Sequence, residues 1–325
     1  MKYVKFGNTG MDVSQVCLGC MSFGDADKDP RKWILHEESS RPIIKKAIEL
    51  GINFFDTANV YAGGTSEEYL GRALKDFVSN RDEIVVATKV LAPMRQGPNA
   101  AGLSRKAIMT EIDNSLKRLG MDYVDLYIIH RWDYNTPIEE TMEALHDITK
   151  AGKCRYIGAS AMYAWQFQKA LYVAEKNGWT KFVSMQNHYN LIYREDEREL
   201  MPLCRDAKIA CTPFSPLANG RLSHDNQTKR AELDQFARDK YDAALEQDRP
   251  VIDRLAELAK KRGISRTQLA LAWMYHKAPV VAPVLGTTKI AHLEEALEAS
   301  SISLSDEEIA FLEELYVPHK IVGHG

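Results

Sequence analysis

Short apolar runs alternate with longer amphipathic stretches along most of the chain. The amphipathic stretches repeat apolar residues at helical spacing, as residues 69–77 do. Eight of the apolar runs have the length of buried strands, and each ends in polar residues; they cover about residues 16–19, 52–55, 84–89, 123–130, 155–160, 182–186, 209–215 and 280–286. We therefore expect parallel strands that alternate with helices.

Eight strand–helix units favour closure into a (β/α)8 TIM barrel, whose sites form at the carboxyl ends of the strands. The alternative is an open doubly wound sheet, which usually has a glycine-rich phosphate turn after its first strand. Here that position, residues 19–24, lacks the GxGxxG pattern. We predict one α/β barrel domain over residues 1–325, with an N-terminal β-hairpin at residues 2–13 and extra C-terminal helices.

Capping residues locate several of the helix ends. A helix is expected to begin at Ser104 and to end at Gly120. Ser265 with Gln268, and Ser305 with Glu308, have the spacing of capping boxes that open two later helices. A further helix is expected near residues 250–262.

Composition says more about the possible functions of the chain than about its fold. The chain has 325 residues and is 45% hydrophobic and 27% charged, which is enough for a large core. A net charge of −3 gives no basic stripe for nucleic acid or for an anionic membrane. No run approaches the roughly 18 apolar residues of a membrane span, and the N-terminus lacks the apolar core of a signal peptide. Five cysteines in a chain of this length favour the reducing cytoplasm.

Cys17 and Cys20 have CxxC spacing, but no second pair exists to complete a zinc site. A redox motif would place the first cysteine at an exposed helix N-terminus. Because this pair straddles the end of an apolar strand, we interpret it as structural packing, with Cys20 close to the strand tips.

Three strands end in residues with complementary chemistry. Asp56, Lys89 and His130 lie at successive strand tips, and Tyr61 follows on the loop after Asp56. A phenol ordinarily has a pKa of about 10, and a neighbouring ammonium group favours its phenolate form. A carboxylate keeps such a lysine charged, and a histidine can hydrogen-bond a substrate carbonyl. Singly, each residue could be an ordinary surface ion pair or a structural histidine.

Together, these four residues suit proton transfer to a carbonyl oxygen. The group contains no nucleophile–base pair for acyl transfer, and its histidine and aspartate do not suggest a metal cluster. We therefore predict a catalytic site without a metal.

Several motifs of the sequence resemble those of the aldo-keto reductases. The motifs are residues 51–61 (GINFFDTANVY), 66–74 (SEEYLGRAL), 87–89 (ATK) and 127–130 (YIIH), and the likeness covers almost the whole chain. Residues 128–141 and 183–194 resemble more narrowly the bacterial YajO-like branch, often labelled 1-deoxyxylulose-5-phosphate synthase and related to aryl-alcohol dehydrogenase-like reductases.

The resemblance implies NADPH as cofactor and a catalytic tetrad of Asp56, Tyr61, Lys89 and His130. Hydride would pass to a carbonyl carbon, and Tyr61 would supply the proton. The resemblance also implies cofactor contacts. Ser160, Gln186 and Asn187 would hold the carboxamide and Phe214 would stack on the nicotinamide ring, while Ser215, Leu217 and Gly220 would meet the pyrophosphate. The adenosine phosphate end would meet Gly286, Thr287, Thr288, Lys289, His292 and Glu295, and Met21 and Ser22 are further expected cofactor contacts.

Three positions depart from the family pattern. Ala161 stands where many relatives have Asn, His292 where a phosphate-binding Arg is common, and Ala296 where an adenine-contacting Asn is common. Lys289 could still pair with a 2′-phosphate, so the expectation is NADPH rather than NADH. The alternative for Thr287 and Thr288 is local helix-capping chemistry.

Aromatic residues and an insert surround the predicted site. Phe23, Trp33 and Trp132 lie on loops on the same rim as Tyr61 and would suit aromatic or small apolar aldehydes, although they could equally pack the loops. The insert, about residues 221–249, is dense in charges of both signs. It could fold over the cofactor as a lid or be a solvated surface excursion.

Two other functions remain open at this stage. Some members of the family act as cofactor-sensing accessory subunits of a partner protein. A sugar-phosphate synthase or lyase could use Lys89 as a Schiff-base nucleophile, but that lysine should be neutral, and Asp56 argues against it. The expected partner is a small carbonyl compound; physiological substrate and oligomeric state are not predicted.

Overall fold

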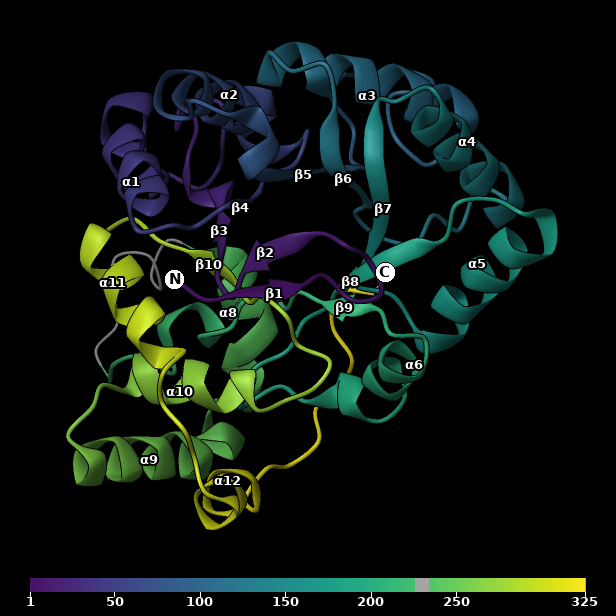
Figure 1. Ribbon diagram of the computed structural model, residues 1–325. Coiled ribbons are helices and arrows are strands. Elements are labelled where there is room, and N and C mark those ends of the chain that lie inside the picture. The colour runs from purple at the N-terminus through teal and green to yellow at the C-terminus, as the bar shows by residue number, and fades with distance from the viewer. Residues whose placement is uncertain (226–233, 325) are drawn as a thin grey trace.

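The computed structural model describes residues 1–225 and 234–324, and Figure 1 shows its strands enclosed by a ring of helices. The hairpin of β1 (Tyr3–Lys5) and β2 (Asp12–Ser14) is antiparallel. The central strands are β3 (Cys17–Gly19), β4 (Phe54–Asp56), β5 (Val85–Val90), β6 (Val124–Ile129), β7 (Cys154–Ser160), β8 (Phe182–Gln186), β9 (Ala210–Cys211) and β10 (Val284–Gly286).

These eight strands are parallel and pair in the order β10-β3-β4-β5-β6-β7-β8-β9. Parallel bridges from Cys211 to Val280 and from Phe214 to Val284 join the two ends of that order. The sheet therefore closes on itself, and the prediction of a (β/α)8 TIM barrel with an N-terminal hairpin is confirmed.

The helices outside the strands follow the predicted alternation. They are α1 (Glu37–Glu49), α2 (Thr65–Phe77), α3 (Arg105–Leu119), α4 (Ile138–Lys150), α5 (Ala164–Asn177), α6 (Leu200–Asp206), α8 (Gln235–Tyr241), α9 (Leu245–Arg262), α10 (Arg266–Tyr275), α11 (Ile290–Ala299) and α12 (Asp306–Glu313). The side chain of Ser104 caps α3 and Gly120 ends it in a left-handed conformation, as predicted. Both predicted capping boxes form, at the starts of α10 and α12.

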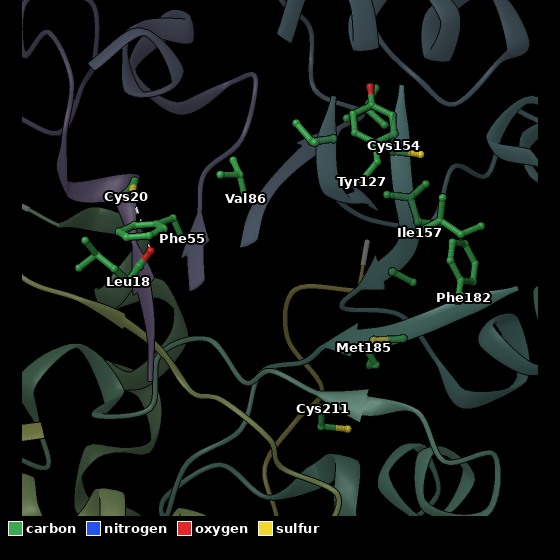
Figure 2. Packing of buried hydrophobic residues seen from close by; sticks show 14 of the residues in the cluster. Leu18, Cys20, Phe55, Val86, Tyr127, Cys154, Ile157, Phe182, Met185 and Cys211 are labelled. Atoms are coloured by element: carbon green, nitrogen blue, oxygen red, sulfur yellow. Dashed lines mark hydrogen bonds between the residues drawn. The ribbon is translucent and has the colours of Figure 1, made fainter. Parts of the chain in front are cut away.

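Side chains on each strand alternate between the barrel interior and the helical layer. Phe54, Val85, Leu126 and Ile128 belong to one buried cluster, which Phe6 of the N-terminal hairpin segment joins. The alternate residues of the same strands pack outward against the helices in a second, larger cluster, whose members Leu18, Phe55, Val86 and Tyr127 are labelled in Figure 2. The interior cluster fills the barrel, so the polar residues one step further along each strand stand above a closed apolar floor.

Three predicted boundaries were wrong. The expected strand 209–215 forms a ladder only at Ala210–Cys211, because Pro213 has no N–H to donate and Ser215 has a φ of 54°. The strand expected at 280–286 is regular only from Val284, directly after Pro283. The helix expected near 250–262 begins at Leu245. Its first turns are charged and mostly exposed, so they lack the apolar periodicity by which a helix is predicted from the sequence.

The predicted insert is only partly described, because its residues 226–233 lie outside the described residues. Its remaining part contains α8 and a 3-10 turn at Asp242–Ala244 that runs into α9. Tyr241 at the end of α8 is fully buried; its hydroxyl lies 2.6 Å from His188 Nε2 and accepts a hydrogen bond from Asn190 Nδ2 at 3.0 Å. This part of the insert is therefore docked on the barrel.

The two cysteines with CxxC spacing lie in the core. Cys17 and Cys20 are free and fully buried, and burial raises the pKa of both thiols well above the ordinary value, which agrees with structural packing.

In residues 1–225 and 234–324, no helix has both the length and the apolar character needed to cross a membrane.

Candidate active site

The strand alternation brings the predicted catalytic residues together. Phe54 and Asp56 have the same parity on β4, Ala87 and Lys89 have it on β5, and Ile128 is followed two residues later by His130 after β6. In register, Asp56 pairs with Ala87, and Lys89 pairs with Ile128. The polar residue on each strand therefore follows an apolar residue that faces the interior, and all point into the same end of the barrel.

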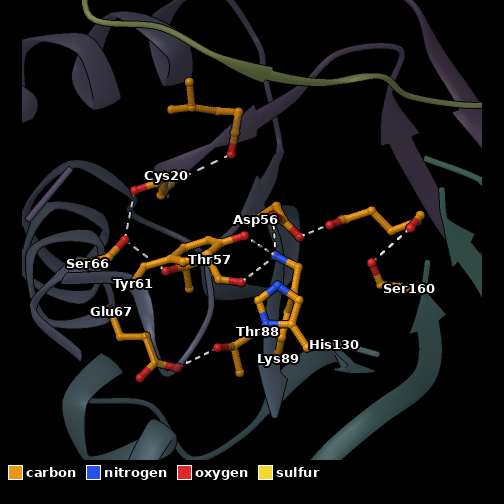
Figure 3. Close-up of polar contacts among 12 residues, drawn as sticks. Cys20, Asp56, Thr57, Tyr61, Ser66, Glu67, Thr88, Lys89, His130 and Ser160 are labelled. Atoms are coloured by element: carbon orange, nitrogen blue, oxygen red, sulfur yellow. Dashed lines mark hydrogen bonds and ion pairs between the residues drawn. The ribbon is translucent and has the colours of Figure 1, made fainter. Parts of the chain in front are cut away.

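Lys89 is the centre of this group, as Figure 3 shows. Its ammonium nitrogen donates to Asp56 Oδ1 at 2.5 Å, to the Thr57 carbonyl oxygen at 2.8 Å and to the Tyr61 hydroxyl at 3.2 Å. The side chains of Lys89 and Asp56 are 0% and 2% exposed. Gln186 Nε2 donates to the second carboxylate oxygen of Asp56 at 2.9 Å. Both oxygens of the buried carboxylate are thus satisfied.

This environment keeps Lys89 protonated. Burial alone would lower the pKa of its ammonium group. The opposing charge of Asp56 and the Tyr61 oxygen outweigh burial, so the pKa of Lys89 is raised above its ordinary value. A charged lysine cannot attack a carbonyl, so this geometry argues against Schiff-base chemistry.

His130 is held neutral beside the phenol. Its ring and that of Tyr61 form an edge-to-face pair with centroids 5.8 Å apart. Burial lowers the pKa of His130 well below its ordinary value of 6.5, and the positive charges of Lys89, Arg131 and Lys240 lower it further. A neutral imidazole can donate a hydrogen bond to a carbonyl oxygen without adding a positive charge.

The loop after β3 fixes the turn that carries Tyr61. Tyr61 opens a 3-10 turn in which Ala62 has a φ of 49°, a strained conformation for a residue with a side chain. The Ala62 N–H donates to Asp29 Oδ2 at 3.2 Å. Asp29 in turn accepts two hydrogen bonds from Arg31, at 2.8 and 2.6 Å, and the Arg31 guanidinium lies 5.9 Å from the Tyr61 ring centroid.

The residues predicted to hold a carboxamide lie at neighbouring strand tips. Ser160 Oγ donates to the Gln186 carbonyl oxygen at 2.9 Å. Asn187 Nδ2 donates to Asp196 at 3.1 Å, which leaves Asn187 Oδ1 buried and unpaired among the described residues. Ser22 Oγ is buried and unpaired in the same sense, next to the half-buried Met21. Two orphaned polar atoms at these tips fit a bound ligand with amide and hydroxyl groups.

Phe214 lies beside this group and opens the predicted pyrophosphate loop. Its ring stacks on His188 with centroids 5.1 Å apart and planes 11° from parallel. Ser215, directly after it, has a φ of 54°. Leu217 and Gly220 flank and close the 3-10 turn at Ala218–Gly220 that follows.

The predicted adenosine phosphate segment starts at Gly286, the last residue of β10. Thr287 Oγ1 accepts from the Lys289 N–H at 3.0 Å and donates to its carbonyl oxygen at 2.9 Å, so this hydroxyl is used in a local turn. The Lys289 and His292 side chains are exposed, with His292 Nδ1 3.2 Å from Thr287 Oγ1. The cationic side chain of Lys289 is accessible to a phosphate, and Thr288 and Glu295 are half-buried.

The three aromatic residues of the predicted pocket differ in exposure. Trp33 and Trp132 are half-buried, and Trp132 lies 6.1 Å from Trp165, measured between ring centroids. Phe23 is 0% exposed and belongs to the main core cluster, so in this structure its ring packs the core and does not face a pocket. Trp132 packs against the same core cluster and Trp33 against a small cluster of Ala26, Ile34 and Ala62, so the pocket roles of the three aromatic residues stay predictions.

Three cationic residues near the site are absent from the sequence predictions. Arg131 follows His130 directly, and its guanidinium donates to Ser160 Oγ at 3.3 Å. Lys240, on α8, places its ammonium nitrogen 4.7 Å from the Phe214 ring centroid. Arg31 is the third. The position of Arg131 after a strand-tip histidine was a usable signal, whereas Lys240 reaches the site only because the insert docks on the barrel.

Comparison with known proteins agrees with this geometry. The family model described as the Aldo/keto reductase family matches residues 15–317. A versiconal hemiacetal acetate reductase of Aspergillus parasiticus is 41% identical over 99% of this chain and 98% of its own length. An aldo-keto reductase of Metarhizium robertsii is 40% identical over 99% of this chain and 93% of its own, and a candidate aryl-alcohol dehydrogenase of Schizosaccharomyces pombe is 40% identical over 99% and 97%. The narrower likeness to the YajO-like branch stays a prediction.

Proposed function

The chain belongs to the aldo/keto reductase family and is an NAD(P)-dependent oxidoreductase, and on that premise we propose that it reduces aldehydes or ketones to alcohols with NADPH, Tyr61 being the proton donor. The observation that carries this proposal is the three-way contact of the Lys89 ammonium with Asp56, Thr57 and Tyr61. It places the positive charge of a buried lysine against the phenol oxygen, above the apolar floor of the barrel.

Each residue of the tetrad then has a distinct task. When bound, NADPH would supply a hydride to the carbonyl carbon. Tyr61 gives its hydroxyl proton to the carbonyl oxygen as negative charge develops there, and the Lys89 ammonium stabilises the phenolate that remains. Asp56 keeps Lys89 charged and oriented. His130, held neutral, donates a hydrogen bond that orients the carbonyl toward Tyr61.

The cofactor contacts remain part of the proposal. Ser22 Oγ and Asn187 Oδ1, both buried and without a partner among the described residues, support a ligand at the strand tips. The exposed Lys289 supports NADPH over NADH, because its ammonium group could pair with a 2′-phosphate. We also propose that the described α8 part of the insert covers the cofactor, since Lys240 lies over Phe214 and Tyr241 contacts His188.

The proposed substrate class is supported by two aromatic residues and by the name of a relative. Trp33 and Trp132 are half-buried on loops that are predicted to share the rim of Tyr61, and one relative carries the name of an aryl-alcohol dehydrogenase. We therefore propose aromatic or small apolar aldehydes as a first class of substrates. The cytoplasm remains the predicted compartment.

The test is NADPH oxidation with an aromatic aldehyde, for the wild type, Tyr61→Phe and Tyr172→Phe. Tyr172 is 59% exposed on α5 and serves as the matched control for loss of a hydroxyl. Loss of the general acid should lower turnover by roughly 10²-fold or more in Tyr61→Phe only.

Other outcomes are equally informative. Full activity in Tyr61→Phe would show that the proton donor is assigned wrongly. Absence of turnover in the wild type, with NADPH binding intact, would favour the accessory-subunit function and direct the search to a protein partner.

A further inference from the structure

Among the residues that the structure describes, two cations at the mouth of the barrel have no acidic partner in an ion pair. Elsewhere around the tetrad, each positive charge is balanced: Lys89 pairs with Asp56, and Arg31 pairs with Asp29. Arg131 instead donates to two neutral oxygens, the His130 carbonyl oxygen and Ser160 Oγ. Within residues 1–225 and 234–324, no carboxylate forms an ion pair with Arg131.

Lys240 is the second of these cations. It is half-buried on α8, and no carboxylate of the described part of the chain pairs with it. Its strongest acidic neighbour, Asp234, caps the N–H of Ala237 at the start of the same helix. Burial and the charge of Arg131 lower the pKa of Lys240 to about 8, so holding this charge here has a cost that the protein does not offset.

Both cations converge on one aromatic ring. The Arg131 guanidinium carbon lies 5.6 Å, and the Lys240 ammonium nitrogen 4.7 Å, from the centroid of Phe214. Both also lower the pKa of His130 through their charge, so both lie within electrostatic reach of the catalytic histidine. A cation over an aromatic face is stabilised only modestly, by about 0.5–2 kcal/mol. A nicotinamide stacked on Phe214 would compete with that contact and leave Lys240 in need of another partner.

We propose that Arg131 and Lys240 form a binding site for an oxyanion, a carboxylate or phosphate, carried by the carbonyl substrate. The inference rests on the proposed reductase function and refines its substrate class: an aldehyde or ketone whose apolar body lies toward the tryptophans and whose anionic group meets the two cations. A planar guanidinium and a mobile ammonium are the two side chains best suited to such groups.

The phosphates of NADPH are the other possible source of an oxyanion. The position of the pair argues for the substrate, because Arg131 adjoins His130 in the chain and both cations act on its imidazole. The segment predicted for the adenosine phosphate, with the exposed Lys289, follows β10 instead. The experiment must nevertheless separate the two sources.

The test compares 4-carboxybenzaldehyde with its uncharged methyl ester. Both contain the same ring and aldehyde, so the ratio of their kcat/KM values isolates the anionic group. We expect the wild type to favour the acid by about tenfold or more, because a charge-assisted contact usually has an effect of this size. The difference should arise mainly from a lower KM for the acid. Lys240→Met should bring the ratio close to one, and Lys240→Arg should restore most of it. Lys260→Met, an exposed lysine on α9, is the matched control.

Each possible result has a distinct meaning. A ratio near one in the wild type, or one that Lys240→Met leaves unchanged, would overturn the oxyanion site while the reductase function stands. An unchanged ratio with weaker NADPH binding in Lys240→Met, measured by fluorescence titration, would assign the cation to the cofactor. If the wild type reduces neither aldehyde, the reductase proposal fails and this inference fails with it.

Discussion

Lys89 and Lys240 both lie beside the reacting end of the barrel, but their charges are balanced differently. Lys89 is fully buried and has a carboxylate at 2.5 Å, and the pKa of its ammonium group is raised. Among the described residues, Lys240 has an aromatic ring and the charge of Asp234 but no ion-paired carboxylate, and burial with the neighbouring Arg131 lowers its pKa to about 8. The balanced charge of Lys89 belongs to the folded structure, whereas the charge of Lys240 has, as we propose, a ligand for its partner.

The sharpest way to break this comparison is to remove each charge in turn. Lys89→Met leaves the Asp56 carboxylate buried without a cation, which should lower the free energy of unfolding by about 3–5 kcal/mol and abolish most turnover. Lys240→Met removes a charge that repels Arg131, so the free energy of unfolding should not fall. Urea titration of both variants beside the wild type measures the difference.

A surface ion pair supplies the control for that comparison. Lys153 Nζ lies 2.6 Å from Asp113 Oδ1, but the two side chains are 32% and 58% exposed. Lys153→Met should therefore cost less than about 1 kcal/mol. If Lys89→Met costs no more than this, the buried pair does not stabilise the fold as argued.

A change of pH should act on the second lysine at moderate values. Lys240 carries its charge below a pKa of about 8 and loses it above, so the preference for an anionic aldehyde should be complete at lower pH and fall as pH rises through about 8. The charged or titratable groups that act on it are Arg131, Asp234, His130 and His188, of which the two histidines have pKa values well below the ordinary 6.5 and stay uncharged there.

The variant with a permanently charged side chain distinguishes this titration from other causes. In Lys240→Arg, the acid-to-ester ratio of kcat/KM should stay constant across the same pH range, because a guanidinium does not lose its proton there. A ratio that falls equally in both proteins would mean that another group titrates.

The sequence predicted the balanced region well for a physical reason. Asp56, Lys89 and His130 lie at the ends of apolar strands, and the two-residue alternation of a strand determines which side chains point into the barrel. Because the strands are parallel, their carboxyl ends lie at the same rim. Local pattern and global fold therefore lead to the same site. Tyr61 was predicted from its place on the loop after Asp56, and the family resemblance added the cofactor residues, whose contacts stay predictions.

The unbalanced region could not be found in the same way. Lys240 belongs to an insert dense in charge, and nothing local separates it from its charged neighbours; only the docking of Tyr241 against His188 brings it to Phe214. Phe23 was predicted on the pocket rim from its loop position, but its ring is fully buried in the core cluster, and its pocket role stays a prediction. Loop and insert positions depend on tertiary packing that alternation does not encode.

The smallest expected effect is on the pKa of His130, which depends on the cations of both regions. Burial and the charges of Lys89, Arg131 and Lys240 hold the pKa of this imidazole well below 6.5, so it is uncharged at pH 6.5 and above. With the uncharged methyl ester as substrate, kcat/KM should therefore be flat from about pH 6.5 to 7.5, and any fall from protonation of His130 should lie at lower pH. Removing one of the three cations in Lys240→Met should raise the pKa of His130, moving that fall upward by a fraction of a pH unit. The pH profiles of the two proteins measure this shift, and a limb at the same pH in both would mean that the charge of Lys240 does not reach the catalytic histidine.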